Sequence, residues 1–276
     1  MSFPYQIIFC DLDGTLLDSR MELSDENAKA IHTLTQNGIL FVPNSGRAFG
    51  EMPESIRKNP DIRYYICSDG TVIYDKLTGE CKTDCLSNDV VNAVYDLLAH
   101  YDTYLSVHAD NASYVERTLT NEEHLPHYQV SAKTREFLYD TNIPTDHFER
   151  FCRTHHKTEM VCAYFHSDEE REHCRQQLAK MGGLMTVTSI PHTLEIISAS
   201  AGKGNTLLRF ANHMGVDPKN TIALGDSGND ADMLRASGHG VAMKNAWDEL
   251  KATADEVLPI TNKEHVMRYL LERYPL

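Results

Sequence analysis

The stretch IIFCDLDGTLLDS, residues 7–19, places two carboxylates, Asp11 and Asp13, one residue apart at the end of an apolar run. Two like charges this close repel strongly unless a cation lies between them or one carboxyl group keeps its proton. Gly14 follows and allows a tight turn, so both carboxylates can face one point. Either a bound cation or a retained proton at this point predicts a functional site where the apolar run ends.

The residues before Asp11 predict a buried parallel strand, because QIIF is a short apolar run without alternation. Asp11 then lies at the carboxyl end of that strand, where open α/β sheets place their ligands. Residues 23–38 predict a helix with Ser24 as its N-cap and Gly38 as its stop. Residues 39–47 predict a second strand, and residues 64–75 predict a third with a turn at Asp69 and Gly70. This alternation predicts an α/β fold with a doubly wound parallel sheet.

The middle of the chain differs from both ends. From about residue 82 to about residue 188 it is richer in His, Tyr and charge, and it contains the strand-like MVCAYFH and the helix-like DEEREHCRQQLAKMG. The strongly patterned sequence returns with TLEIISAS and continues to the C-terminus. We therefore expect a discontinuous core domain, residues 1–81 and 189–276, with an α/β cap domain inserted over residues 82–188.

Four motifs at separate positions agree in placing charged and anion-binding groups at strand ends or helix starts. The first is DLDGT at residues 11–15, and the second is SGR at residues 45–47, with a hydroxyl and backbone N–H groups able to hold an anion. Lys203 starts a predicted helix, and GDSGND at residues 225–230 joins a strand to a helix. Singly these are an ordinary turn, loop, surface charge and helix start. Together, in this order, they predict an active site.

At these motifs the chain resembles the haloacid dehalogenase (HAD) superfamily, and more closely its Cof-type, class IIB branch of capped phosphatases. DLDGTLLDS together with GDSGNDADML carries the resemblance, and GVAMKNAWDELKATADEV also looks like text of that branch. The resemblance implies a Rossmann-like core sheet with the cap inserted between the second and third motifs. It covers nearly the whole core, whereas the insert matches only in placement and size.

The resemblance also implies the catalytic roles. Asp11 would attack the phosphorus and form an aspartyl phosphate, and Asp13 would act as general acid and then as general base. Mg²⁺ would be the cofactor, because a hard cation prefers oxygen ligands. Its expected ligands are Asp11, Asp13 through its backbone carbonyl, and Asp226, with Asp230 as a further metal-site carboxylate that acts either directly or through water. A charged metal next to Asp11 and a retained proton on Asp13 would resolve the repulsion between the two carboxylates.

The phosphoryl group would be held by a set of hydroxyl, amide and cationic groups: Leu12, Ser45, Gly46, Arg47, Lys203 and Asn229. Arg47 would either contact the substrate or brace its loop. The chain departs from the branch at two places: Asp69-Gly70 stands where Asn-Gly is common, and Ser45 replaces the commoner Thr. The second change keeps the hydroxyl, and the first adds a carboxylate near the expected site.

Composition restricts the partners. The net charge of −14 and the lack of a basic run argue against a nucleic-acid partner. The first apolar stretch stops at Asp11, too short for a signal peptide or a membrane span, so we expect a cytoplasmic protein with no membrane contact. Seven scattered cysteines predict reduced thiols, and CKTDC lacks the second pair that a zinc site needs. We expect a monomer or weak homodimer that takes a small phosphate ester.

Three functions fit the motifs. The first is a Mg²⁺-dependent phosphatase of small metabolites such as sugar phosphates or phosphorylated cofactors. The second is a phosphomutase of the phosphomannomutase type, which needs a basic pocket for a second phosphate; the insert supplies Arg117, Lys133, Arg135, Arg150, Arg153 and Lys157. The third, a catalytically silent binding protein on the same scaffold, predicts an eroded acidic cluster, whereas Asp11, Asp13, Lys203 and Asp226 are all present.

Overall fold

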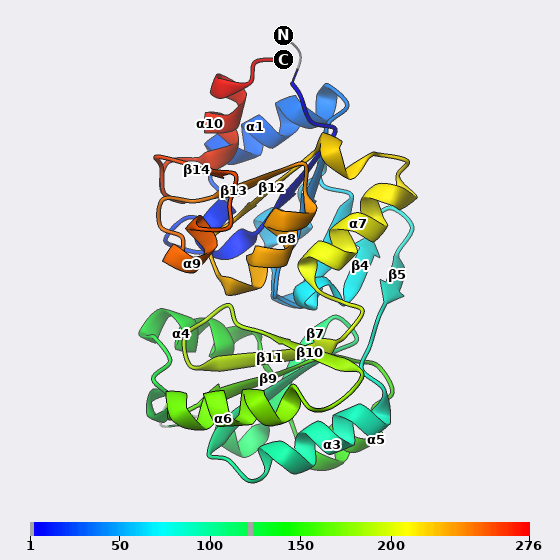
Figure 1. Cartoon of the computed structure of the whole chain (residues 1–276), viewed down its shortest axis with the longest axis vertical. Helices are drawn as coiled ribbons and strands as arrows, with labels where there is room; N and C mark the ends of the chain where they lie inside the picture. Colours follow the sequence, from blue (N-terminus) through cyan, green and yellow to red (C-terminus); the bar gives the residue numbers. More distant parts are fainter. Residues whose placement is uncertain (1–2, 121–123) are drawn as a thin grey trace. The chain divides into compact units, whose positions relative to one another are not determined.

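A computed structural model describes residues 3–120 and 124–276, and its internal contacts divide the chain into two compact units (Figure 1). The first unit comprises Met1–Gly46, Met52–Lys82 and Gly202–Leu276. The second unit comprises Arg47–Glu51 and Thr83–Ala201. Each unit has its own sheet and its own apolar core, and the two are described separately.

The first unit is built on a five-stranded parallel sheet with the order β14-β13-β12-β1-β2. Every residue of the two central strands, β1 and β12, is buried, so both faces of the sheet are covered. This confirms the predicted α/β fold class. The strands are β1 (Ile7–Cys10), β2 (Leu40–Pro43), β12 (Thr221–Gly225), β13 (His239–Ala242) and β14 (Glu256–Val257).

Helix α1 (Asp25–Gln36) begins and ends where the sequence predicts. The side chain of Ser24 accepts a hydrogen bond from the backbone N–H of Asn27, and Gly38 ends the helix with a φ of 82°. The helix packs against α10 (Val266–Arg273) near the C-terminus, and the two lie side by side in Figure 1. The first unit also contains two short helices, α2 (Glu54–Arg57) and α9 (Asp248–Lys251).

Helices α7 (Lys203–His213) and α8 (Ala231–Ala236) pack against each other. The ring of Phe210 in α7 meets the ring of Phe9 in β1 edge to face, with 5.9 Å between ring centres. This contact fixes α7 against the strand that ends at Asp11. The residue that begins α7, Lys203, is therefore held close to the carboxyl ends of the central strands.

A small antiparallel sheet follows β2 in the chain. It has the order β3-β4-β5 and is made of β3 (Tyr64–Cys67), β4 (Val72–Asp75) and β5 (Glu80–Thr83). The sequence predicts one strand-turn-strand unit here, and β3 reaches the parallel sheet through a parallel bridge between Asn44 and Ile66. The turn between β3 and β4 contains Ser68 and Asp69, both with positive φ.

The second unit has a six-stranded sheet with the order β10-β11-β9-β6-β7-β8. Its strands are β6 (Thr103–Ala109), β7 (Ala112–Glu116), β8 (Ile143–Thr145), β9 (Thr158–Phe165), β10 (Leu184–Val187) and β11 (Thr193–Ser198). Two separate clusters of buried apolar side chains cover it, one with α3 (Asn88–Leu98), α5 (Phe148–Thr154) and α6 (Asp168–Leu178), the other with α4 (Ala132–Thr141).

The boundaries of this unit differ from those expected. Strand β11, expected to open the second part of the core, pairs antiparallel with β9 and β10 in the second unit. All six of its residues are buried, as are those of the central strands β1 and β12, so burial alone does not tell the two sheets apart. The chain re-enters the first unit at Gly202, whose φ is 95°. The segment Arg47–Glu51 also joins the second unit, where the N–H of Gly50 donates to the carbonyl of Asn111 at 2.8 Å.

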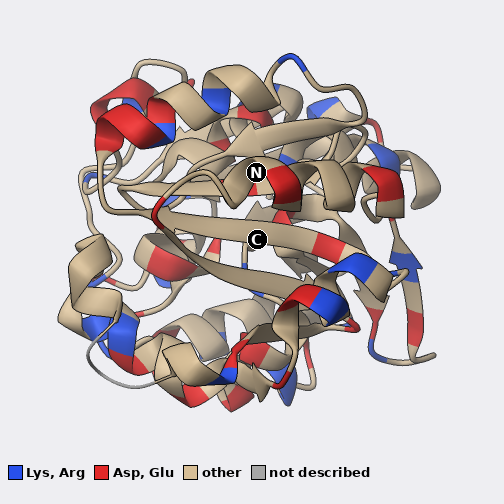
Figure 2. Cartoon of the chain, turned by 90° about the horizontal axis from the view of Figure 1, so that it is seen from below, with Lys and Arg blue, Asp and Glu red and all other residues tan. Residues whose placement is uncertain are grey.

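The distribution of charged residues and the state of the cysteines can be compared with the sequence. Lys and Arg are scattered among more numerous Asp and Glu on the helices seen in Figure 2. All seven cysteines lie in the described part of the chain, and none forms a disulfide. Across residues 3–120 and 124–276, none of the helices has both the length and the apolar character needed to cross a membrane.

Replacing Gly204 with alanine should destabilise the first unit. The added methyl group would lie 2.4 Å from the carbonyl oxygen of Asp232, so α7 and α8 would have to separate. We expect a loss of about 1–3 kcal/mol in the free energy of unfolding, measured by urea denaturation. Gly182→Ala is the matched control: apart from its own and the adjacent residues, no heavy atom of the described chain lies within 4 Å of its methyl position, and we expect a change within about 0.5 kcal/mol. Equal stabilities of both variants would contradict the packing argument.

Candidate active site

Asp11 lies directly after β1, and its N–H donates to the carbonyl of Leu224 in β12 at 2.9 Å. The residue is only 5% exposed. The chain then turns at Gly14, with a φ of 78°, and a methyl group on that residue would lie 2.2 Å from Oδ2 of Asp226. Glycine is therefore required twice, for the left-handed backbone and for the close approach to Asp226.

Lys203 connects two of the expected site carboxylates. Its side chain is fully buried, and Nζ donates to Oδ1 of Asp11 at 2.7 Å and to Oδ1 of Asp230 at 2.6 Å. Burial alone would lower the pKa of Lys203, but the carboxylates of Asp11, Asp230 and Asp69 outweigh it and hold that pKa well above the ordinary value. The ammonium group therefore stays charged in the core.

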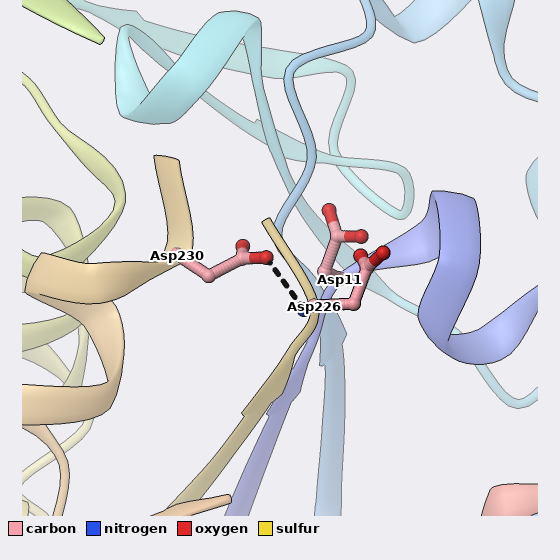
Figure 3. Close-up of side chains that lie close together, drawn as sticks. All are labelled: Asp11, Asp226 and Asp230. Atoms are coloured by element: carbon pink, nitrogen blue, oxygen red, sulfur yellow. Dashed lines mark hydrogen bonds between the residues drawn. The ribbon is translucent and has the colours of Figure 1, made fainter. Parts of the chain in front are cut away.

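Asp230 anchors the loop that follows β12. Its Oδ2 accepts from the backbone N–H groups of Asp226 and Ser227, at 2.9 and 3.0 Å, while its Oδ1 accepts from Lys203. Figure 3 shows its carboxylate directed at the backbone of Asp226. Both oxygens of Asp230 are thus engaged by donors within the protein, and the side chain is fully buried.

One oxygen of each of three carboxylates, those of Asp11, Asp226 and Asp230, lies within 4.8 Å of the others. Burial is the main cause that raises the pKa of Asp11 well above its ordinary value, and of Asp226 to about 8, with Asp230 adding to both shifts and Lys203 opposing them. One ammonium group therefore does not balance the cluster. A divalent cation with oxygen ligands fits this set.

Within that set, Asp11 and Asp226 are the better placed to hold a cation. Their carboxylates lie beside each other at the ends of β1 and β12 (Figure 3). Oδ1 of Asp226 accepts a long hydrogen bond, 3.4 Å, from the hydroxyl of Thr15. Asp230, with both oxygens already engaged, would instead orient the loop and hold Lys203.

Asp13 differs from Asp11 in its surroundings. It lies in the same turn, η1 (Leu12–Leu16), with an extended conformation of φ −77° and ψ 123°, and its side chain is exposed. Its negative charge adds to the raised pKa of Asp226, so it lies close enough for the two charges to interact. A buried carboxylate and an exposed one, two residues apart, suit two different roles.

The groups expected to hold phosphate gather around Asp69. The backbone N–H of Asp69 donates to the carbonyl of Ser45 at 3.1 Å, and Ser45 is 1% exposed. The amide of Asn229 donates from Nδ2 to Oδ1 of Asp69 at 2.7 Å, and its own Oδ1 accepts from the hydroxyl of Ser227 at 2.8 Å. A methyl group on Gly46 would lie 3.2 Å from Oδ1 of Asp69.

Two residues expected to contact phosphate, Arg47 and Leu12, have side chains that pack elsewhere in the structure. Arg47 belongs to the second unit, where its guanidinium stacks 4.2 Å from the ring centre of Phe137 and donates to the carbonyl of Glu51 at 2.8 Å. These contacts agree with the bracing alternative. The side chain of Leu12 is fully buried in the apolar core, which leaves its backbone as the part able to reach a phosphate.

Several supporting residues were not predicted. Asn44 donates from Nδ2 to the carbonyl of Lys203 at 3.2 Å, and Asp232 accepts at Oδ2 from the N–H of Gly204 at 2.9 Å, so both fix the start of α7. Asp69 was noted only as a departure from the family. The spacing Ser227-x-x-Asp230 at a helix start is typical of a capping box, and it could have indicated the anchoring role of Asp230.

Comparisons with known proteins agree with this geometry. The family model of the haloacid dehalogenase-like hydrolases matches residues 8–270. The 5-amino-6-(5-phospho-D-ribitylamino)uracil phosphatase YwtE of Bacillus subtilis is 29% identical, over 96% of this chain and 96% of that protein. The phosphatase YwpJ of the same organism is 26% identical, over 97% of this chain and 99% of that protein.

Solved structures show the same architecture. A haloacid dehalogenase-like hydrolase from B. subtilis superposes with a TM-score of 0.83 at 28% identity, covering 98% of this chain and 100% of that one. A sugar phosphatase of HAD subclass IIB has a TM-score of 0.80 over 98% of both chains, and at 19% identity it supports the fold alone. The chain therefore belongs to the haloacid dehalogenase-like hydrolases, as a Cof-type phosphatase.

Proposed function

We propose that this protein is a Mg²⁺-dependent phosphatase of small phosphorylated metabolites, sugar phosphates or phosphorylated cofactors, and that it works through an aspartyl phosphate on Asp11. The observation that carries the proposal is the contact of Lys203 with both Asp11 and Asp230, beside Asp226, at the ends of the central strands. The name of the relative YwtE, a phosphatase of a ribityl phosphate, supports the same substrate class.

In the first step, an oxygen of Asp11 attacks the phosphorus of the ester. A bond forms between that oxygen and phosphorus, and the bond from phosphorus to the alcohol oxygen breaks. Asp13 gives its proton to the departing oxygen, which would otherwise leave as an unstable alkoxide. The hydrogen bond from Lys203 at 2.7 Å holds Asp11 in one orientation for this attack.

In the second step, water attacks the phosphorus of the aspartyl phosphate. Asp13, now ionised, takes a proton from that water, and Asp11 departs as a carboxylate. The exposure of Asp13 supports this role, because a residue that exchanges protons with an alcohol and with water must reach both. Asp11 is buried, which limits the access of competing nucleophiles.

The negative charge of the transferring group needs donors around it. The hydroxyl of Ser45, the N–H of Gly46, the ammonium of Lys203 and the amide of Asn229 are the groups assigned to this task. When bound by Asp11, Asp226 and the backbone carbonyl of Asp13, Mg²⁺ would neutralise the carboxylates and polarise the phosphoryl group. Asp230 would hold Lys203 and the loop that carries Asp226.

The contacts within the second unit favour a phosphatase over a phosphomutase. A phosphomutase needs basic side chains available for the second phosphate of a bisphosphate. Of the six basic residues considered, three donate to neighbours in their own unit: Arg117 to Asp146, Arg135 to the carbonyl of Val130, and Arg153 to Asp96 and Glu149. Comparing the rate of phosphate release with that of isomer formation on a sugar phosphate separates the two activities.

Purified protein should hydrolyse a generic aryl phosphate with Mg²⁺ and lose that activity in excess chelator. Without a cation, ionised Asp11 and Asp226 would repel the anionic ester as well as each other, and their raised pKa values favour the protonated form, in which Asp11 is a poor nucleophile. The measurement is release of the phenolate in Mg²⁺ and after chelation, followed by a screen of phosphorylated metabolites. Full turnover in excess chelator would show that the metal assignment is wrong, and restored activity on adding Mg²⁺ back is the control.

The stability of the metal-free protein should fall as the pH rises. Because the pKa of Asp226 is about 8 in the fold and ordinarily 3.8, the folded state binds the extra proton, and stability is lost between these two values. Melting in chelator from about pH 5 to about pH 8 should therefore show a smaller decline for Asp226→Asn than for the wild type. Mg²⁺ at about 100 times its Kd should raise the wild-type Tm by roughly 5–10 °C.

The variant Asp25→Asn serves as the control for these melting curves, since it removes the same charge from an exposed position in the first turn of α1. It should keep the wild-type pH dependence and the full response to Mg²⁺. Asp226→Asn should lose most of the response to Mg²⁺. If Mg²⁺ stabilised Asp226→Asn as much as the wild type, Asp226 would not be a metal ligand.

The two carboxylates of the first turn should fail in different ways when changed to Asn. Asp11→Asn should lose nearly all activity, because an amide is a poor nucleophile. Asp13→Asn should lose about 10²- to 10⁴-fold on alkyl phosphates and less in the first step with an aryl phosphate, whose leaving group needs little protonation. Its aspartyl phosphate should accumulate and add mass to the peptide that contains Asp11. Phosphate found on Asp13 instead would reverse the assigned roles.

A further inference from the structure

The turn between β3 and β4 holds a strained backbone next to the site. Ser68 and Asp69 have φ values of 49° and 51°, in the left-handed region that residues with a side chain adopt at a cost. Neighbouring segments fix this turn: the carbonyl of Asp69 accepts from the N–H of Gly202 at 3.1 Å, and the carbonyl of Gly70 accepts from the hydroxyl of Thr206 at 2.7 Å. The backbone of the turn therefore bridges Ser45 and the start of α7.

This backbone places one carboxylate that the mechanism does not use. Asp69 is 1% exposed, and its Oδ1 accepts from Nδ2 of Asn229 at 2.7 Å. The other end of the Asn229 amide accepts from Ser227 at 2.8 Å, so both ends are defined. Because a carboxylate only accepts hydrogen bonds, Asp69 determines which end of the amide is the NH₂ group.

The same carboxylate lies against the backbone expected to hold phosphate. A methyl group on Gly46 would lie 3.2 Å from Oδ1 and 3.5 Å from Oδ2 of Asp69, so no side chain separates the two. Its charge also contributes to the field at Lys203. A negative charge beside the Gly46 backbone would repel a phosphate dianion held by that backbone, and its burial reduces the screening by water.

We propose that Asp69 is a positioning residue that orients the amide of Asn229, and that its negative charge weakens the retention of inorganic phosphate after each turnover. The inference rests on the proposed function. The first effect favours the transferring phosphoryl group, which needs a correctly directed NH₂ group. The second acts on the product, whose negative charge remains in the site until it leaves.

The decisive variant is Asp69→Asn, which keeps the shape and an oxygen able to accept from Asn229 but removes the charge. In Mg²⁺ buffer, inorganic phosphate measured by titration calorimetry should bind about tenfold tighter than to the wild type. Phosphate should inhibit the variant more strongly as a product, and kcat should change by less than about threefold wherever the chemical step limits turnover. Asp25→Asn, at an exposed position of the same unit, should match the wild type in both measurements.

The orientation of Asn229 is tested with Asp69→Ala, which removes the acceptor as well as the charge. We expect kcat to fall about tenfold, and Asp69→Asn to be free of this loss. If Asp69 acts through Asn229, adding Asp69→Ala to Asn229→Ala should lower kcat no further. Melting curves of each variant verify that the protein is folded, and the calorimetric result for Asp69→Asn stands even where Asp69→Ala does not fold.

Each outcome separates this inference from the proposed function. Unchanged phosphate affinity in Asp69→Asn would overturn the role of the charge, and equal kcat in Asp69→Ala and Asp69→Asn would overturn the orienting role. A wild-type protein that hydrolyses no phosphate ester, but whose Asp69→Asn variant binds phosphate more tightly, would contradict the proposed function while supporting the assignment of Asp69.

Discussion

The buried ammonium of Lys203 is the interaction on which the rest of the first unit depends. Its Nζ holds Asp11 at the end of β1 and Asp230 in the loop after β12, with both contacts shorter than 2.8 Å. Removing the ammonium would leave the buried negative charges of Asp11 and Asp230 without a neutralising cation, which costs far more than the loss of a surface ion pair. Lys203 begins α7, so the hydrogen bonds that Asn44 and Asp232 make to the first two residues of this helix also hold the ammonium in place.

The parallel core and the charged centre of the site could be predicted from the sequence. Asp11, Lys203 and Asp226 each directly follow a strand or begin a helix, and the ends of parallel strands meet at one edge of a sheet, so local pattern was sufficient. Asp230 lies in the acidic cluster that the sequence predicts, and its carboxylate also accepts from two backbone N–H groups, which the sequence does not predict. Which donors surround an oxygen depends on the folded loop, and spacing alone does not reveal it.

Other features depend on contacts between distant parts of the chain. Strand β11 was expected in the core, but the pattern of a fully buried strand does not tell which of two sheets the strand joins. The stacking of Arg47 on Phe137 joins residues 90 positions apart, and no periodicity encodes it. The left-handed conformation of Asp69 is similarly imposed by its neighbours, since aspartate is only modestly favoured there.

The assignment of Arg47–Glu51 to the second unit has a consequence for how such proteins diversify. The chain passes between the units after Gly46, after Glu51, after Lys82 and after Ala201. An exchange that replaced only residues 83–201 by the equivalent part of a relative would leave Arg47 and Glu51 facing a foreign surface. Recombination between family members would therefore preserve stability best where this five-residue segment is inherited together with the large insert, although the two are separate in the gene.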